Sequence, residues 1–191
     1  RLSSAQLEVV PCHYSALPRM FERRQLPGDV GFVQVSPPDR DGVVTLGIGV
    51  DYAADAMLHS RTLIAEINER MPRTSGGPKL SLDAFAATLH TDRALLEAPQ
   101  REPDAVDRAI ADRVAALVKD GDTIQIGVGS LPAAVLSALA GHRHLGVHSG
   151  MISDGVLDLV ERGVVTGSRK EVDAGVVVTG AAMGSTRLYA S

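Results

Sequence analysis

Hydrophobic and polar positions alternate along the first half of the chain in a pattern that predicts strands separated by helices. Alternating or continuous β-prone runs indicate strands at residues 7–10, 29–35, 43–46 and 62–67. Apolar residues at helical spacing indicate helices at residues 15–24 and 51–58. Proline, glycine and polar residues indicate loops at residues 36–42 and 71–78.

The second half carries a clearer repeat of helix and strand. Residues 89–103 are polar with weak periodicity and are expected to form a linker. Residues 104–119 are predicted to form an amphipathic helix with the apolar stripe Val106, Ile110, Val114, Leu117 and Val118. Further strands are predicted at residues 123–126, 145–148 and 174–179. The intervening helices are predicted between Ser130 and Gly141 and at residues 154–162. This alternation indicates an α/β fold with a mostly parallel sheet and flanking helices.

Composition narrows the class of protein. The chain has 191 residues, 45% hydrophobic and 22% charged, so it can bury a core and is not of the disordered class. Its net charge of -4 argues against a nucleic-acid partner. A single cysteine, Cys12, allows no intrachain disulfide and favours a reducing, cytoplasmic location. No apolar run reaches the roughly 20 residues of a membrane span, so no membrane partner is expected.

A glycine turn follows the strand predicted at residues 123–126. Gly127, Val128, Gly129 and Ser130 lead into a helix whose first turn contains Pro132. The glycines allow a ligand to approach the backbone, and free N–H groups at the helix start suit an anion or a developing oxyanion. A tight strand-to-helix turn without a ligand explains the same pattern equally well. The turn lacks the lysine of a P-loop and the third glycine of a dinucleotide-binding fingerprint.

A second polar loop is expected at His148, Ser149, Gly150 and Met151. Neighbours on a strand point to opposite faces, so the histidine and serine cannot readily form a nucleophile–base pair. We therefore favour a structural role for this serine over a catalytic one. Glu66 lies near the end of the strand predicted at residues 62–67, where it can face a cleft or bond the following loop. No cluster of histidine, cysteine and carboxylate at ligand spacing indicates a metal site.

Six stretches, taken in order, resemble the acetyl-CoA hydrolase/CoA-transferase family, in the branch that contains 4-hydroxybutyrate and acetate CoA-transferases. They are PCHYSALPRMF, DVGFVQVSPPDRDGVVTLGIGVDY, AEINERMPRTSG, DTIQIGVGSLPAAVL, LGVHSGMISDGVLDLVERGVVTG and GAAMGSTRLY. Each stretch alone is weak, whereas the ordered set is specific and runs over nearly the whole chain.

The resemblance implies two similar open-sheet α/β domains of the CoA-transferase type, facing each other across an active-site cleft. Family members are about twice as long as this chain. Residues 1–98 are then expected to be the later part of the first domain, and residues 99–191 the beginning of the second. The chain starts at Arg1 and stops at Ser191 just after an apolar run and a glycine-rich turn, so we expect an excerpt of a longer protein. The family also suggests a homodimer.

The resemblance further implies a glutamate nucleophile in a stretch like His-Thr/Ser-Glu-Met. In the family, that carboxylate attacks an acyl-CoA thioester and gives an acyl-glutamyl anhydride and free CoA thiolate. The thiolate then attacks the glutamyl carbonyl to form a glutamyl-CoA thioester, which a second carboxylic acid resolves. Gly150 stands at the glutamate's place here and has no side chain to react. Three explanations are open: water replaces the carboxylate, another acid such as Glu66 or Asp154 has taken over, or the protein binds acyl-CoA without turnover.

The remaining site residues also follow from the resemblance. Gly127, Val128 and Gly129 correspond to the motif that lines the thioester pocket, with the amides of Gly129 and Ser130 as the oxyanion hole. The residues around Gly150 that are expected to contact acyl-CoA are His148, Ser149 and Met151. Coenzyme A enters as the acyl carrier of the substrate, and no permanently bound cofactor or metal is expected. A sugar-phosphate isomerase on a similar scaffold is a weaker alternative that rests on fold analogy alone.

Overall fold

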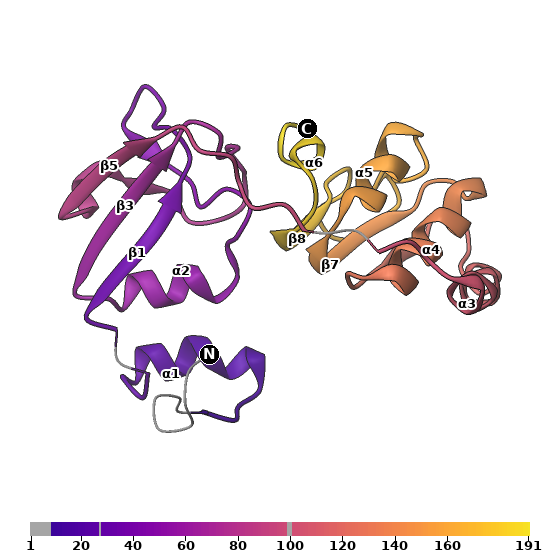
Figure 1. The fold of residues 1–191 in the computed structure, drawn as a ribbon, viewed down its shortest axis with the longest axis horizontal. Coiled ribbons are helices and arrows are strands. Elements are labelled where there is room, and N and C mark those ends of the chain that lie inside the picture. Colours follow the sequence, from indigo (N-terminus) through magenta and orange to yellow (C-terminus); the bar gives the residue numbers. More distant parts are fainter. Residues whose placement is uncertain (1–8, 27, 99–100) are drawn as a thin grey trace.

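The computed structural model describes residues 9–26, 28–98 and 101–191, which form two α/β lobes (Figure 1). We call residues 9–98 the amino-terminal lobe and residues 101–191 the carboxyl-terminal lobe. Each lobe has a three-stranded parallel sheet with helices packed on it, so the predicted α/β fold with mostly parallel strands and flanking helices is confirmed. Within the described ranges, no helix has the length and apolar character needed to cross a membrane.

The sheet of the amino-terminal lobe is made of β1 (Val30–Val35), β3 (Thr62–Asn68) and β5 (Ala87–Thr91), in that order. Helix α2 (Asp51–Leu58) connects the first two strands, and α1 (Leu17–Glu22) packs against α2. The lobe is completed by the antiparallel pair β2 (Val43–Val44) and β4 (Leu80–Ser81) and by 3-10 helices at Tyr14–Ala16 and Leu82–Ala84. The core residues are Val35, Val44, Leu46, Met57, Ala65, Ile67, Leu80 and Phe85.

The sheet of the carboxyl-terminal lobe is made of β6 (Thr123–Ile124), β7 (Gly146–Ile152) and β8 (Val178–Ala182), in that order. Its helices are α3 (Ala105–Ala115), α4 (Ser130–Ala138), α5 (Asp154–Glu161) and α6 (Thr186–Tyr189), with a 3-10 turn at Leu139–Gly141. Asp104 begins α3 with a capping box, because its carboxylate accepts the Val106 and Asp107 N–H groups at 2.8 Å. A core centred on Leu136, Leu139 and Val147 lies between sheet and helices.

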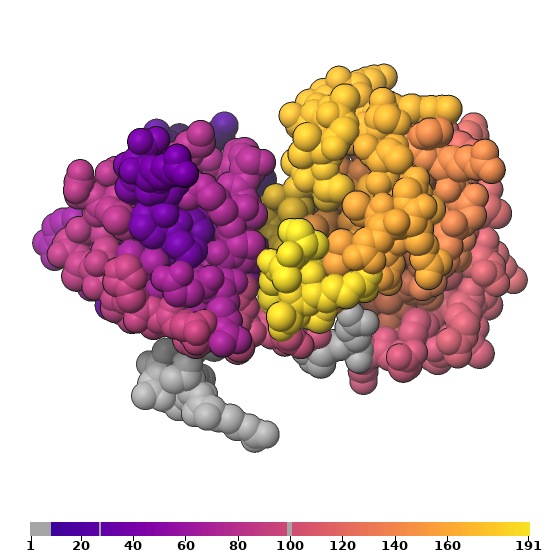
Figure 2. All heavy atoms as spheres, turned by 90° about the horizontal axis from the view of Figure 1, so that it is seen from above, coloured from indigo at the N-terminus to yellow at the C-terminus, as the bar shows by residue number. Residues whose placement is uncertain are grey.

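The two lobes are joined by main-chain hydrogen bonds as well as by the linker. Residues 48–50 run antiparallel to β8: the Val50 N–H donates to the Gly180 carbonyl at 2.9 Å, and the Ala182 N–H to the Ile48 carbonyl at 2.8 Å. Ile48 also packs with Leu95 from the linker against a small buried cluster of Leu157, Leu188 and Tyr189. The space-filling view shows the yellow carboxyl-terminal residues lying against the amino-terminal lobe (Figure 2).

The predicted apolar stripe of α3 is wrong in part. Val106 is 64% exposed and Ile110 is 40% exposed, whereas Ala111 and Ala115 are buried. Small alanines let α3 approach α4 closely, so the packed face is the one with small side chains rather than the one with large apolar residues.

Several strand boundaries also differ from the sequence expectation. The expected linker at residues 89–103 begins later, because residues 87–91 form β5. The strand expected at residues 174–179 begins only at Val178. Of the strand expected at residues 7–10, residues 7 and 8 lie outside the described part of the chain, and residues 9 and 10 form no strand.

Candidate functional site

All three strands of the carboxyl-terminal lobe end at the same edge of the sheet, because they are parallel. β6 leads into the glycine turn, β7 into Ser153 at the start of α5, and β8 into residues 183–185. Ligands of open α/β sheets bind at such an edge. A cavity of about 220 Å³ lies there, between these loops and the linker. Its lining residues are Ala98, Arg101, Glu102, Pro103, Val128, Gly129, Ala133, Ser137, Ser153, Asp154, Gly155, Asp158, Met183 and Gly184.

The start of α4 presents backbone donors near this cavity. Gly129, and not Ser130 as expected, is the residue that precedes the helix, and its φ of 125° is a conformation that side chains rarely adopt. Ser130 and Leu131 are the first two helical residues, whose N–H groups have no acceptor within a helix. The turn therefore combines free amides with the positive end of the helix dipole.

Gly150 lies inside β7 rather than in a loop, which corrects the expectation for residues 148–151. It is exposed, and a Cβ built on it would meet no other atom within 4 Å. A side chain at this position would therefore project into open space from the face of β7 opposite the core. Neither Gly150 nor Met151, which is half-buried, lines the 220 Å³ cavity.

Ser149 and His148 point to opposite faces of β7, as the strand periodicity predicts. Ser149 is buried, and its hydroxyl donates to the Ile126 carbonyl at 2.8 Å and accepts the Ile126 N–H at 3.2 Å. These bonds hold the beginning of the glycine turn beside β7. His148 is exposed and lines a second cavity, of about 370 Å³, together with Arg169 and Lys170.

Glu66, one of the two acids predicted as substitutes for the missing glutamate, is held in an ion pair. Its carboxylate accepts two hydrogen bonds from Arg93, at 2.5 and 2.8 Å, and one from Thr91 at 2.8 Å. The hydrogen bonds from Arg93 lower the pKa of Glu66 to about 2. A carboxylate stabilised to this degree is a weak base and a weak nucleophile.

Asp154, the other predicted acid, lies at the first turn of α5 and lines the cavity. It is buried, and its carboxylate accepts the Ser185 N–H at 2.9 Å and the Ser185 hydroxyl at 2.5 Å. These bonds tie the loop after β8 to the loop after β7. The geometry thus gives Asp154 the structural task of shaping the cavity edge.

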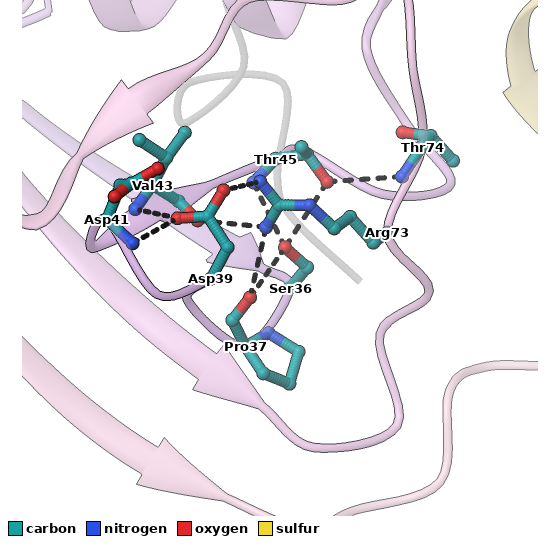
Figure 3. A network of polar contacts seen from close by, with 8 residues as sticks. All are labelled: Ser36, Pro37, Asp39, Asp41, Val43, Thr45, Arg73 and Thr74. Atoms are coloured by element: carbon teal, nitrogen blue, oxygen red, sulfur yellow. Dashed lines mark hydrogen bonds and ion pairs between the residues drawn. The ribbon is translucent and has the colours of Figure 1, made fainter.

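A polar network holds the loop that leads to residues 48–50 (Figure 3). Arg73 donates to the Asp39 carboxylate at 2.6 Å and to the Val43 carbonyl at 2.8 Å. Asp39 also accepts the Val43 N–H at 2.9 Å, and this backbone hydrogen bond is the main reason why the pKa of Asp39 is lowered. The Thr45 N–H donates to the buried Ser36 hydroxyl at 3.0 Å. The loop therefore has a fixed path into the junction of the lobes.

Sequence reasoning did not single out Asp51, the first residue of α2. A Cβ built on Gly180 would collide with the Asp51 carboxylate and would come within 3.1 Å of the Gly150 carbonyl oxygen. The Asp51 carboxylate therefore lies against Gly180 of β8, close to the Gly150 carbonyl of the neighbouring strand. Nothing in the sequence signals this neighbourhood, because residues 51, 150 and 180 meet only through the pairing of residues 48–50 with β8.

Comparison with known proteins places the chain among CoA-transferases. The family described as acetyl-CoA hydrolase/transferase N-terminal domain matches residues 3–95. The 4-hydroxybutyrate coenzyme A transferase of Clostridium kluyveri is 36% identical over 98% of this chain and 44% of its own length. The succinyl-CoA:acetate/propanoyl-CoA:succinate CoA transferase of Fasciola hepatica is 31% identical over 98% of this chain and 40% of its own length.

Solved structures give the same picture. A 4-hydroxybutyrate CoA-transferase from Porphyromonas gingivalis aligns with a TM-score of 0.89 and 33% identity, over 97% of this chain and 47% of that one. RipA from Yersinia pestis aligns with a TM-score of 0.91 and 34% identity, over 97% of this chain and 43% of that one. The chain thus spans less than half the length of these relatives. Residues 3–95 thus match the N-terminal domain of the acetyl-CoA hydrolase/transferase family, and the chain as a whole is similar in sequence and fold to CoA-transferases.

Proposed function

We propose that the complete protein acts on acyl-CoA thioesters and transfers the acyl group to water. The proposal combines family membership with one observation, the open space around Gly150 on the exposed face of β7. Because no packing constraint demands a glycine there, the missing side chain is a chemical difference and not a structural necessity. Removing a covalent nucleophile costs ~10⁶-fold in turnover in enzymes that depend on one.

The glycine turn supplies the second part of the proposed site. The amides of Gly129 and Ser130 lie at the head of α4, and such donors stabilise the oxyanion that forms when a nucleophile adds to a thioester carbonyl. Val128 and Gly129 line the 220 Å³ cavity at the carboxyl edge of the sheet. This task requires no side chain at position 150, so the oxyanion site serves hydrolysis as well as transfer.

The decisive experiment compares the wild type with Gly150→Glu and with the matched control Gly141→Glu. Position 141 is also exposed and open, since a Cβ there meets nothing within 4 Å. Each complete protein is incubated with butyryl-CoA, with and without acetate, and the products are identified by mass spectrometry.

We expect the wild type and the control to release free CoA and butyrate, and Gly150→Glu to form acetyl-CoA when acetate is present. Formation of acetyl-CoA by the wild type at the rate of Gly150→Glu would refute the hydrolytic assignment. Acetyl-CoA formed by the wild type at that rate would show that an acid elsewhere in the protein acts as the nucleophile.

A second function, binding of acyl-CoA without turnover, is favoured by one observation. Both acids predicted as substitutes, Glu66 and Asp154, are engaged in hydrogen bonds within their own lobes. Calorimetric binding of butyryl-CoA by both the wild type and Gly150→Glu, with no product from either, would establish this alternative.

The organisation of the whole protein is also a proposal. We infer that residues 1–98 and 99–191 belong to two successive domains, which the separate sheets on either side of the linker support. By family resemblance, we expect a homodimer, which sedimentation of the complete protein tests directly. A cytoplasmic location stays a prediction.

A further inference from the structure

We propose that Asp51 is the general base that activates the attacking water beside Gly150. This inference rests on the proposed hydrolysis of acyl-CoA. It concerns a carboxylate that comes from the amino-terminal lobe, whereas the thioester site and the missing nucleophile belong to the carboxyl-terminal lobe.

The backbone carries Asp51 to this place. The segment of residues 48–50 pairs with β8 through the Val50–Gly180 and Ala182–Ile48 hydrogen bonds, and Asp51 follows immediately. The polar network around Arg73 fixes the loop before this segment (Figure 3). The backbone position of Asp51 is therefore set by hydrogen bonds at the junction and in the loop before it, as a base that must meet a water at hydrogen-bonding distance requires.

Two glycines leave room for the carboxylate and for a reacting group. At Gly180 a Cβ would collide with the Asp51 carboxylate in its present conformation, so the glycine leaves room for the acid here. At Gly150 the space is open, and the Gly150 carbonyl oxygen lies 3.1 Å from the Cβ position of Gly180, the same position that the Asp51 carboxylate overlaps. A water between the Asp51 carboxylate and the Gly150 carbonyl would occupy the space that the glutamate side chain is expected to fill in relatives with the motif His-Thr/Ser-Glu-Met.

The conformation and contacts of Asp51 also suit a positioned base. Its φ is 29°, an unusual value for a residue other than glycine, and strained residues of this kind cluster at functional sites. The Tyr14 hydroxyl faces the Asp51 carboxylate, and partial burial together with interaction with this carboxylate raises the pKa of Tyr14. Tyr14 is in turn held edge-on against Tyr52, with ring centroids 5.7 Å apart. The acid thus has an orienting partner of its own.

The proposed step balances without any further reagent. The water oxygen forms a bond to the thioester carbonyl carbon while one of its protons passes to the Asp51 carboxylate. The C–S bond then breaks, and the CoA thiolate takes that proton from Asp51. The products are a carboxylic acid, which ionises in solution, and CoA with a free thiol.

The test uses Asp51→Asn in the complete protein, with Asp55→Asn as the matched control one turn later on α2. Asparagine tolerates the positive φ as aspartate does, so the substitution removes the base without a new backbone strain. Hydrolysis of butyryl-CoA is followed by thiol release, and butyryl-CoA binding by calorimetry. We expect kcat to fall ~100-fold or more in Asp51→Asn, with a dissociation constant within threefold of wild type and with Asp55→Asn unchanged.

A double variant separates loss of the base from loss of the fold. In the Gly150→Glu background, Asp51→Asn should lose hydrolysis but keep CoA transfer from butyryl-CoA to acetate, since the new glutamate replaces water as the nucleophile. Loss of both activities, or a hydrolytic kcat in Asp51→Asn above one third of wild type, overturns the assignment of Asp51. A wild type that binds butyryl-CoA but does not hydrolyse it overturns it too. A wild type that does not bind butyryl-CoA refutes the proposed function itself.

Discussion

Ser149→Ala tests whether the hydroxyl of this residue holds the glycine turn in place. Ser149 is 5% exposed and makes two hydrogen bonds to the backbone of Ile126, a donated bond of 2.8 Å and an accepted bond of 3.2 Å. Alanine leaves the Ile126 N–H and carbonyl without this partner. With a net contribution of about 1 kcal/mol for each bond, we expect the variant to lose about 2 kcal/mol of local stability.

Hydrogen–deuterium exchange reports this loss directly, because the Ile126 N–H is one of the two donors involved. A change of about 2 kcal/mol corresponds to exchange about thirtyfold faster at this amide if it opens by local unfolding. The matched control is Ser137→Ala on α4, where an exposed hydroxyl bonds the Ala133 carbonyl four residues earlier. Alanine favours the helix at that position, so we expect a change within about 0.5 kcal/mol.

Equal exchange rates of peptides containing Ile126 in the wild type and in Ser149→Ala would show that the Ser149 hydroxyl does not hold the glycine turn. Equal acceleration in Ser149→Ala and Ser137→Ala would also refute it, because it would point to general destabilisation and not to the bond between β7 and the glycine turn. Activity provides a second readout: a displaced turn should lower the rate of thioester cleavage more than the affinity for acyl-CoA.

Two further predictions concern the surroundings of the site. Because Arg93 lowers the pKa of Glu66 from an ordinary value of 4.5 to about 2, this pair stabilises the fold above pH 4.5 and the contribution is lost as the pH falls towards 2. Urea unfolding between these pH values should therefore show a smaller pH dependence in Glu66→Gln than in the wild type, and identical curves would contradict the assignment. Gly180→Ala should displace the Asp51 carboxylate and lower the free energy of unfolding by about 1–3 kcal/mol. Gly49→Ala, whose Cβ would meet no atom within 4 Å, should leave the free energy of unfolding unchanged. Thermal unfolding and butyryl-CoA hydrolysis are measured for both variants. Equal stability and equal hydrolysis rates in the two variants would exclude the collision.

The sequence predicted the helices and strands that depend on local signals. Helix α2 was predicted with its observed bounds, and the starts of β1 and β3 were predicted to within one residue. The strand β7 was predicted to end at His148, because serine and glycine favour turns, yet it continues to Ile152. Pairing with β8 extends it, since Met151 and Ile152 lie opposite Ala181 and Ala182. Such an extension depends on a partner strand that is distant along the chain and carries no local signal.

Most candidate site residues named from the sequence lie in the carboxyl-terminal lobe, with Glu66 in the other. The glycine turn was named from a short local motif, whereas Gly150 was named from the family resemblance. The pairing of Glu66 with Arg93 joins β3 to residues after β5, so it could not be inferred from one strand. The approach of Asp51 to Gly150 depends on how two lobes join, which the periodicity of either lobe does not contain.

The junction between residues 48–50 and β8 has a consequence for the evolution and motion of the protein. Main-chain atoms make its hydrogen bonds, so most side chains along it are free to change without loosening it. Any hinge opening of one lobe against the other must first break these bonds. Ligand entry by a route that leaves them intact is therefore favoured, and flexibility is expected in the surrounding loops rather than in the angle between the two lobes.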